Sequence, residues 1–144
     1  MKKGTDYTGV TICYFCHDGA GKFLMNFRSK NCRDEHERWD NGAGGLEFGD
    51  GVEETLRKEI MEEYCTEVIK FEFLGFRELH REHEGRQTHW ISLDFKVQVD
   101  PLTVRNGEPH KFEKIEWFTL DTIPSPTHSQ FPKFLEKNRE KLTA

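Results

Sequence analysis

Long apolar runs and an excess of basic residues are both missing from this 144-residue chain. No apolar stretch approaches the roughly 18–20 residues that a membrane-spanning helix needs, so no membrane contact is expected. The net charge is −5, from 21 basic and 26 acidic side chains. This charge argues against a general nucleic-acid-binding surface but not against a small nucleotide. Residues 1–6 are charged and no apolar signal segment follows them, so a cytoplasmic location is expected.

Cysteine is also sparse, with four residues in the chain. Cys13 and Cys16 have the spacing of a zinc or redox pair, and His17 follows directly. A second pair at metal-ligand spacing is missing, and the two thiols stand in a β-branched and aromatic run that is typical of a strand. We therefore expect reduced, partly buried thiols rather than a zinc site.

The rest of the sequence predicts strands and two helices within one domain, residues 1–144. β-Branched, aromatic and alternating apolar residues predict strands over 8–16, 22–28, 67–79, 88–99 and the second half of 104–118. The polar stretches 29–40 and 80–87 are expected to be connections. One helix follows the glycines near residue 51, and an amphipathic helix ends the chain. This order predicts an α/β protein with α/β/α layers.

The central helix carries many carboxylates on one side. Its apolar face has a residue at every fourth position, namely Val52, Leu56, Ile60 and Tyr64. Glu59, Glu62 and Glu63 are related by i+3 and i+4 spacing, and Glu63 projects into the apolar stripe. Each like-charge pair costs about 0.2–0.5 kcal/mol, and a carboxylate at a buried face costs more unless it is paired or bound to metal. The cluster is either a solvated acidic face or a site for a hard cation, Mg²⁺ or Mn²⁺.

Glycine is concentrated just before this helix, at Gly42, Gly44, Gly45, Gly49 and Gly51. Glycine lets the backbone approach a ligand closely, and a helix N-terminus attracts anions. The combination predicts a phosphate-binding loop beside a helix that binds a divalent cation.

Residues 44–66 resemble the Nudix box, Gly-x5-Glu-x7-Arg-Glu-U-x-Glu-Glu-x-Gly-U, in which U is aliphatic. The matching positions are Gly44, Glu59, Ile60, Glu62 and Glu63. The departures are Asp50 for the first Glu, Lys58 for Arg, Cys65 for the last Gly and Thr66 for the last aliphatic residue. Asp50 has a shorter reach, and Lys58 lacks the bidentate guanidinium but can pair with a neighbouring Glu. The acidic cluster itself is intact.

The resemblance implies the fold and chemistry of the Nudix hydrolases. It implies an α/β/α sandwich with a mixed central sheet, Mg²⁺ or Mn²⁺ as cofactor, and Glu59 and Glu63 as leading metal ligands with Glu62 beside them. In that family the general base is a box glutamate or one from a later loop. Here Glu62 or Glu59 is favoured and Glu108 stays open; the further loop candidates are Glu113 and Glu116.

Substrate contacts are expected from Gly44 and Gly45 and from side chains upstream of them. The candidate cations for a phosphate or base are Arg28, Lys30 and Arg33, although each alone is more often an ordinary solvated side chain. Trp39 interrupts the polar run before the glycines. Its ring either covers the core or stacks on a ligand.

A second segment narrows the substrate class. Asn106, Glu108, Pro109 and Lys111, followed by Glu116-Trp117-Phe118, resemble a segment of Nudix hydrolases that act on nucleoside triphosphates. No run like the SQPWPFPxS signature of other members follows the box. The expected reaction is Mg²⁺-dependent hydrolysis of a phosphoanhydride bond in a nucleoside triphosphate or a related nucleoside diphosphate derivative, with release of a nucleoside monophosphate and pyrophosphate.

The expected partner is this small molecule and not a nucleic acid polymer, and a homodimer stays open. Two alternatives also stay open. One is a nucleotide-binding sensor of Nudix fold with little turnover, which the changes at Lys58 and Asp50 make conceivable. The other is a small structural domain whose acidic cluster is merely solvated.

Overall fold

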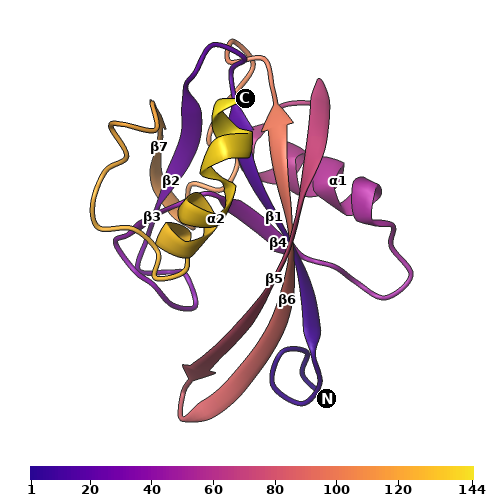
Figure 1. Cartoon of the computed structure of the whole chain (residues 1–144). Coiled ribbons are helices and arrows are strands. Elements are labelled where there is room, and N and C mark those ends of the chain that lie inside the picture. Colours follow the sequence, from indigo (N-terminus) through magenta and orange to yellow (C-terminus); the bar gives the residue numbers. More distant parts are fainter.

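The computed structural model describes all 144 residues and contains seven strands and two helices (Figure 1). In chain order these are β1 (Gly9–His17), β2 (Phe23–Arg28), β3 (Trp39–Asp40), β4 (Gly42–Gly45), α1 (Val52–Tyr64), β5 (Lys70–His83), β6 (Arg86–Gln98), β7 (Phe112–Phe118) and α2 (Phe131–Thr143). The five predicted strands and both predicted helices are present. Neither helix is long and apolar enough to cross a membrane.

The strands form one mixed sheet around β1. β1 runs parallel to β6, from Gly9 opposite Trp90 to His17 opposite Gln98. All other pairings are antiparallel: β4 lies against the middle of β1, β2 against its end, β3 and β7 flank β2, and β5 pairs with β6. The mixed central sheet implied by the Nudix resemblance is therefore confirmed.

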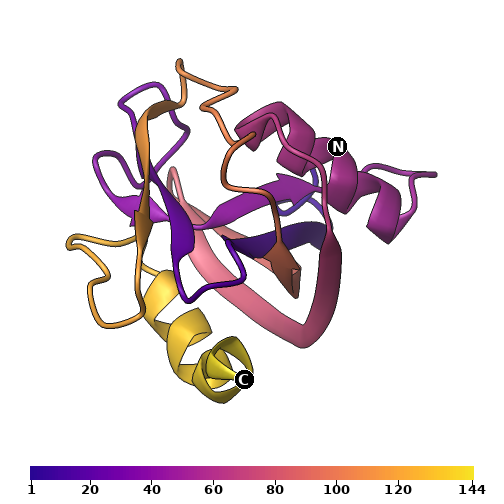
Figure 2. The same cartoon turned by 90° about the horizontal axis from the view of Figure 1, so that it is seen from above.

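The two helices lie on opposite faces of this sheet (Figure 2). An apolar core lies under each of them. Along β1, Ile12, Tyr14 and Cys16 belong to the core under α1, whereas Cys13 and Phe15 belong to the core under α2. Successive strand residues point to opposite faces, so a strand covered on both faces is apolar at every position. The helices complete the two cores with Leu56, Ile60 and Tyr64 of α1 and with Phe131, Phe134 and Leu142 of α2. The predicted α/β/α layering is confirmed.

The same alternation separates the two cysteines of β1. Cys13 and Cys16 lie in different cores, so they cannot bind one metal ion together. Both are buried free thiols, and burial raises the pKa of each thiol well above its ordinary value. Protonated, buried thiols are unreactive. The expected burial of these two thiols is confirmed.

Two stretches are more regular than the sequence predicts. Residues 42–45, expected as part of a loop, form β4, where a Cβ at Gly42 would overlap the ring of Tyr14. The polar residues 80–87, expected as a connection, extend β5 and β6, and the turn is confined to Glu84 and Gly85. Both turn residues have positive φ, 51° and 78°, as a tight hairpin turn requires. The result is a long hairpin whose outer end projects past both helices (Figure 1).

Cys65 and Thr66, the two departures at the end of the box, change the contacts at the C-terminal end of α1, but the helix still ends there. Cys65 adopts the left-handed conformation, with φ 57° and ψ 31°, and its N–H donates to the Met61 carbonyl at 3.0 Å. A non-glycine residue in this conformation costs roughly 1–2 kcal/mol. Thr66 is buried, and its hydroxyl lies 2.6 Å from that of Thr103. The hydrogen bond between Thr66 and Thr103 therefore replaces the apolar packing that an aliphatic residue would make at this position of the box.

Candidate active site

Glu63 is the buried member of the acidic cluster on α1. Its exposed fraction is 4%, and the hydroxyl of Tyr14 on β1 donates a hydrogen bond to its carboxylate. Burial raises the pKa of Glu63 from 4.5 to about 8, although the hydrogen bond from Tyr14 and the charge of Lys111 oppose this rise. A buried carboxylate is costly as an anion unless a cation compensates it. A cation bound beside Glu63 would therefore stabilise its ionised carboxylate.

Glu59 lies against the backbone of β4. A Cβ at Gly44 would overlap the Glu59 carboxylate, so only glycine allows the strand and this side chain to approach so closely. Glu59 is half-buried; burial raises its pKa, and the charge of the exposed Glu62 raises it further. The close approach explains why the first position of the box needs glycine.

The loop before β7 docks on the end of α1 and brings Glu108 toward the cluster. The N–H of Gly107 donates to the carbonyl of Glu63 at 2.9 Å. The charge of Lys111 lowers the pKa of Glu59, and the charge of Glu108 raises it. The fold therefore joins the box to the later loop, which supplies both an acidic and a basic side chain.

The donor set fits a hard divalent cation. Carboxylate and carbonyl oxygens are the ligands that Mg²⁺ and Mn²⁺ prefer in proteins. The raised pKa values of Glu63 and Glu59 show that negative charge is crowded and poorly solvated here. A bound cation would relieve both effects at once, so the residues present fit the metal that the box implies.

The metal-free protein is expected to lose stability as the pH rises from about 5 to about 8. The pKa of Glu63 is 4.5 in its ordinary state and about 8 in the fold, so between these values the folded state holds a proton that the unfolded state has released. This group therefore favours folding below its unfolded pKa, and the free energy of unfolding falls through the window by up to about 1.4 kcal/mol per pH unit.

Urea unfolding of chelator-treated protein at a series of pH values measures this effect. Glu63→Gln, which cannot ionise, is expected to flatten the profile. An equally steep profile in the variant would assign the pH dependence to another group.

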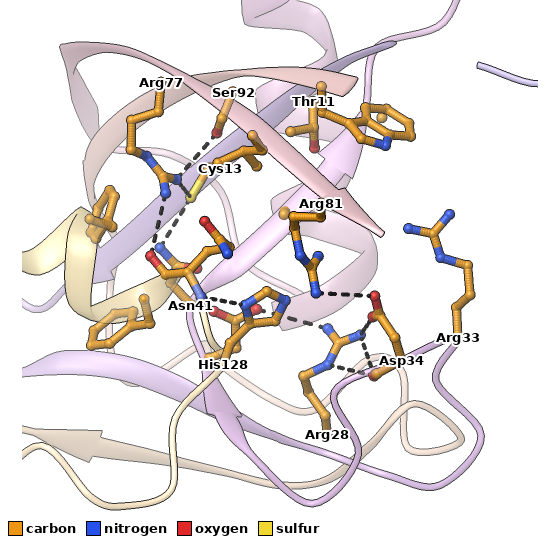
Figure 3. Close-up of a pocket in the computed structure, with 18 residues that line it drawn as sticks. Thr11, Cys13, Arg28, Arg33, Asp34, Asn41, Arg77, Arg81, Ser92 and His128 are labelled. Carbon is orange, nitrogen blue, oxygen red and sulfur yellow. Dashed lines mark hydrogen bonds and ion pairs between the residues drawn. The ribbon is translucent and has the colours of Figure 1, made fainter. Parts of the chain in front are cut away.

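A cavity of about 300 Å³ opens on the other side of β4, toward α2 (Figure 3). Ala43 and Gly45 line it, whereas Gly44 between them faces Glu59. β4 therefore separates the cavity from the acidic cluster. Asp40 connects the two, because it lines the cavity and its charge raises the pKa of Glu63.

Four arginines line this cavity, and three of them are already paired with acids, namely Arg28, Arg77 and Arg81. Arg33 is exposed and forms no ion pair, so its guanidinium is free for an anionic ligand. Burial raises the pKa of Asp40, opposed by the charges of His128 and Arg28. The cavity thus offers a free cation and a carboxyl group with perturbed acidity.

The predicted substrate contacts fall into three groups. Arg28 and Gly45 line the cavity, and Gly44 faces the acidic cluster. Trp39 requires a correction, because it does not line the cavity. It is buried between Phe27 and Phe118, with ring centroids 5.1 Å from each, so its ring belongs to the core and is not available to stack on a ligand there.

The predicted supporting residues make few contacts. Asp50 is exposed and does not cap α1, whose N-cap is Gly51 without a side-chain hydrogen bond. Lys58 is exposed and forms no ion pair, although its charge lowers the pKa of Glu59. Glu113 and Glu116 lie exposed on β7.

Sequence reasoning missed most of the cavity. Arg77 and Arg81 alternate with Leu79 on one face of β5, and all three line the cavity. Their period of two is the available signal, but the polar residues from His80 onward favour a loop and hide it. Asp40 and Asn41, directly before the glycines, are two further cavity residues that the sequence did not indicate.

A sequence profile of the NUDIX domain matches residues 7–137. This protein belongs to the Nudix family. The match extends far beyond the box and includes both the acidic cluster and the cavity.

Two characterised proteins are similar to this Nudix chain in sequence. The oxidized purine nucleoside triphosphate hydrolase of Danio rerio is 27% identical over 117 residues, which are 71% of this chain and 65% of that protein. The NAD-capped RNA hydrolase NudC of Pseudomonas aeruginosa is 28% identical over 85 residues, 57% of this chain and 27% of that protein. The matched part of the chain thus spans just under two thirds of the first relative and about a quarter of the second.

Solved structures share the fold. A MutT NUDIX hydrolase from Burkholderia pseudomallei superposes with a TM-score of 0.80 at 22% identity, over 92% of this chain and 98% of that chain. The MutT protein from Methanosarcina mazei Go1 gives 0.76 at 20% identity, over 93% and 95%. These likenesses confirm the Nudix fold.

Proposed function

We propose that this protein hydrolyses a phosphoanhydride bond in a nucleoside triphosphate or a related nucleoside diphosphate derivative, with Mg²⁺ as cofactor. The observation that carries the proposal is the buried Glu63 carboxylate, whose pKa the charge of Glu59 raises, on a helix with the box spacing. The charge of Glu62 in turn raises the pKa of Glu59. The products expected are a nucleoside monophosphate and pyrophosphate.

Each residue of the cluster has a role in this proposal. Glu59 and Glu63 hold the cation, with Glu62 beside them. When bound, Mg²⁺ neutralises phosphate charge and lowers the pKa of bound water. Glu62, which is exposed, and Glu108, which is half-buried in the docked loop, are the carboxylates left free to accept the proton. Lys111 adds a positive charge that the leaving phosphate can meet.

The cavity under α2 supports a nucleotide as substrate. Asp40 and Asn41 line the cavity, and their side chains can donate or accept hydrogen bonds at a base edge. Arg33 is free to bind phosphate. The relative from Danio rerio carries the name of an oxidized purine nucleoside triphosphate hydrolase, which makes such triphosphates the first to test. The relative named as an NAD-capped RNA hydrolase makes a dinucleotide cap the second.

Turnover of a substrate panel with and without Mg²⁺ tests the proposal. The panel contains ordinary and oxidised purine nucleoside triphosphates, a nucleotide sugar and NAD-capped RNA. Pyrophosphate release from a triphosphate, abolished by chelator, is the expected result. Tight nucleotide binding without turnover under any divalent metal would instead indicate the sensor alternative.

A further inference from the structure

Outside the candidate active site, two histidines and a glutamate meet on the long β5–β6 hairpin. His80 and His89 stand directly opposite each other in the strand register. Their rings stack, with centroids 4.3 Å apart and planes inclined by 14°. Glu78, two positions before His80, points to the same face, and one ligand atom from each residue lies within 4.8 Å of the others.

His89 is oriented as a metal ligand would be. Its Nδ1 atom lies 2.9 Å from Thr8 Oγ1, while its Nε2 atom is buried and has no hydrogen-bond partner. An oxygen of Glu78 lies 3.6 Å from Nε2. With the proton on Nδ1 and donated to Thr8, Nε2 presents its lone pair toward the glutamate. A hydrogen bond at the second ring nitrogen commonly fixes the tautomer of a metal-binding histidine.

We propose that Glu78, His80 and His89 bind a divalent transition-metal ion of the Zn²⁺ class. Two imidazoles and one carboxylate form a known three-ligand set for Zn²⁺, with water as the fourth ligand. Mg²⁺ prefers an all-oxygen set, so this site and the acidic cluster of α1 select different metals.

The distances are compatible with such a site. Metal–ligand bonds of about 2.1 Å in a tetrahedron place ligand atoms about 3.4 Å apart. The separation of 3.6 Å between His89 and Glu78 is already close to this value. The side chains of Glu78 and His80 are exposed, so they can rotate to shorten the remaining distances from at most 4.8 Å.

The bound ion would stabilise the outer end of the β5–β6 hairpin. This end of the hairpin contacts the N-terminal segment, where the N–H of His89 donates to the Gly4 carbonyl at 2.8 Å and Arg86 pairs with Asp6 at 3.0 Å. Most residues of β5 beyond Leu74 are exposed or half-buried, so little apolar packing holds them. A metal that cross-links the two strands therefore stabilises the region that the cores do not reach.

Cobalt binding to the full chain tests the proposal. The protein is stripped of metal, supplied with excess Mg²⁺ to occupy the acidic cluster, and titrated with Co²⁺, whose visible absorption bands report tetrahedral coordination. One equivalent is expected to bind and to be displaced by Zn²⁺. His80→Ala and His89→Ala are each expected to weaken binding by at least about 100-fold, and Thr8→Val by about 10-fold.

Two variants serve as matched controls. His83→Ala removes a histidine from the opposite face of the same strand, and Glu63→Gln alters the acidic cluster; both are expected to bind Co²⁺ like the wild type. Zn²⁺ is expected to raise the Tm of the wild type but not of His89→Ala. The proposal is overturned if the wild type shows no Co²⁺ absorption, or if His80→Ala and His89→Ala, folded by circular dichroism, keep wild-type affinity.

Discussion

Replacing Glu63 with glutamine is expected to lower kcat/KM for nucleotide hydrolysis by about 10³-fold, equivalent to about 4 kcal/mol of transition-state stabilisation. The amide keeps the shape of the side chain, and Tyr14 can still donate its hydrogen bond. The negative charge that attracts the cation is lost, so the Mg²⁺ concentration for half-maximal rate should also rise. Initial rates on the best substrate of the panel, measured across a Mg²⁺ titration, give both quantities.

The matched control is Glu54→Gln, which removes one carboxylate from the exposed first turn of the same helix. Its rate should equal that of the wild type. The metal-free Glu63→Gln protein should be at least as stable as the wild type at pH 8, since it no longer buries an ionisable carboxyl group; a low rate would then not reflect unfolding. A wild-type rate in Glu63→Gln would remove Glu63 from the metal site.

The acidic cluster was predictable because it depends on one helix. The i+3 and i+4 spacing of Glu59, Glu62 and Glu63 fixes their relative positions once α1 forms. The apolar residues at every fourth position also showed that Glu63 would enter the buried face, and its exposed fraction of 4% agrees. The sequence could not show that Tyr14 would meet this carboxylate, because that contact depends on how β1 packs against α1.

The cavity and the histidine pair depend instead on strand register. Arg77 meets Asp94, and His80 meets His89, only because β5 and β6 pair over their whole length with a bulge between Phe73 and Gly75. Charged residues have low strand propensity, and for this reason 80–87 was expected to be a loop. The two-residue turn at Glu84 and Gly85, the one local signal for a long hairpin, stands inside that polar run.

Replacing Asp94 with alanine is expected to lower the free energy of unfolding by about 3–5 kcal/mol. Asp94 is fully buried, and its two oxygens accept hydrogen bonds from Arg77 at 2.6 and 3.0 Å. Ser92 also donates to it at 2.8 Å. Without Asp94, the Arg77 guanidinium beside the cavity keeps its charge in a largely buried place and loses the counterion to which it is hydrogen-bonded. Urea unfolding at pH 7, followed by tryptophan fluorescence, measures the change.

A double-mutant cycle separates the ion pair from the other contacts of Asp94. Arg77→Ala alone leaves Asp94 as the buried unpaired charge, so it is also expected to be costly, and the double variant should lose clearly less than the sum of the two. The exposed pair of Arg57 with Glu53 on α1, at 3.0 Å, is the matched comparison; Arg57→Ala should cost only about 0.3–0.5 kcal/mol. If Asp94→Ala costs no more than this surface variant, water or a shifted side chain compensates Arg77. The guanidinium at the base of the cavity is then movable, and its position no longer constrains which ligand the cavity accepts.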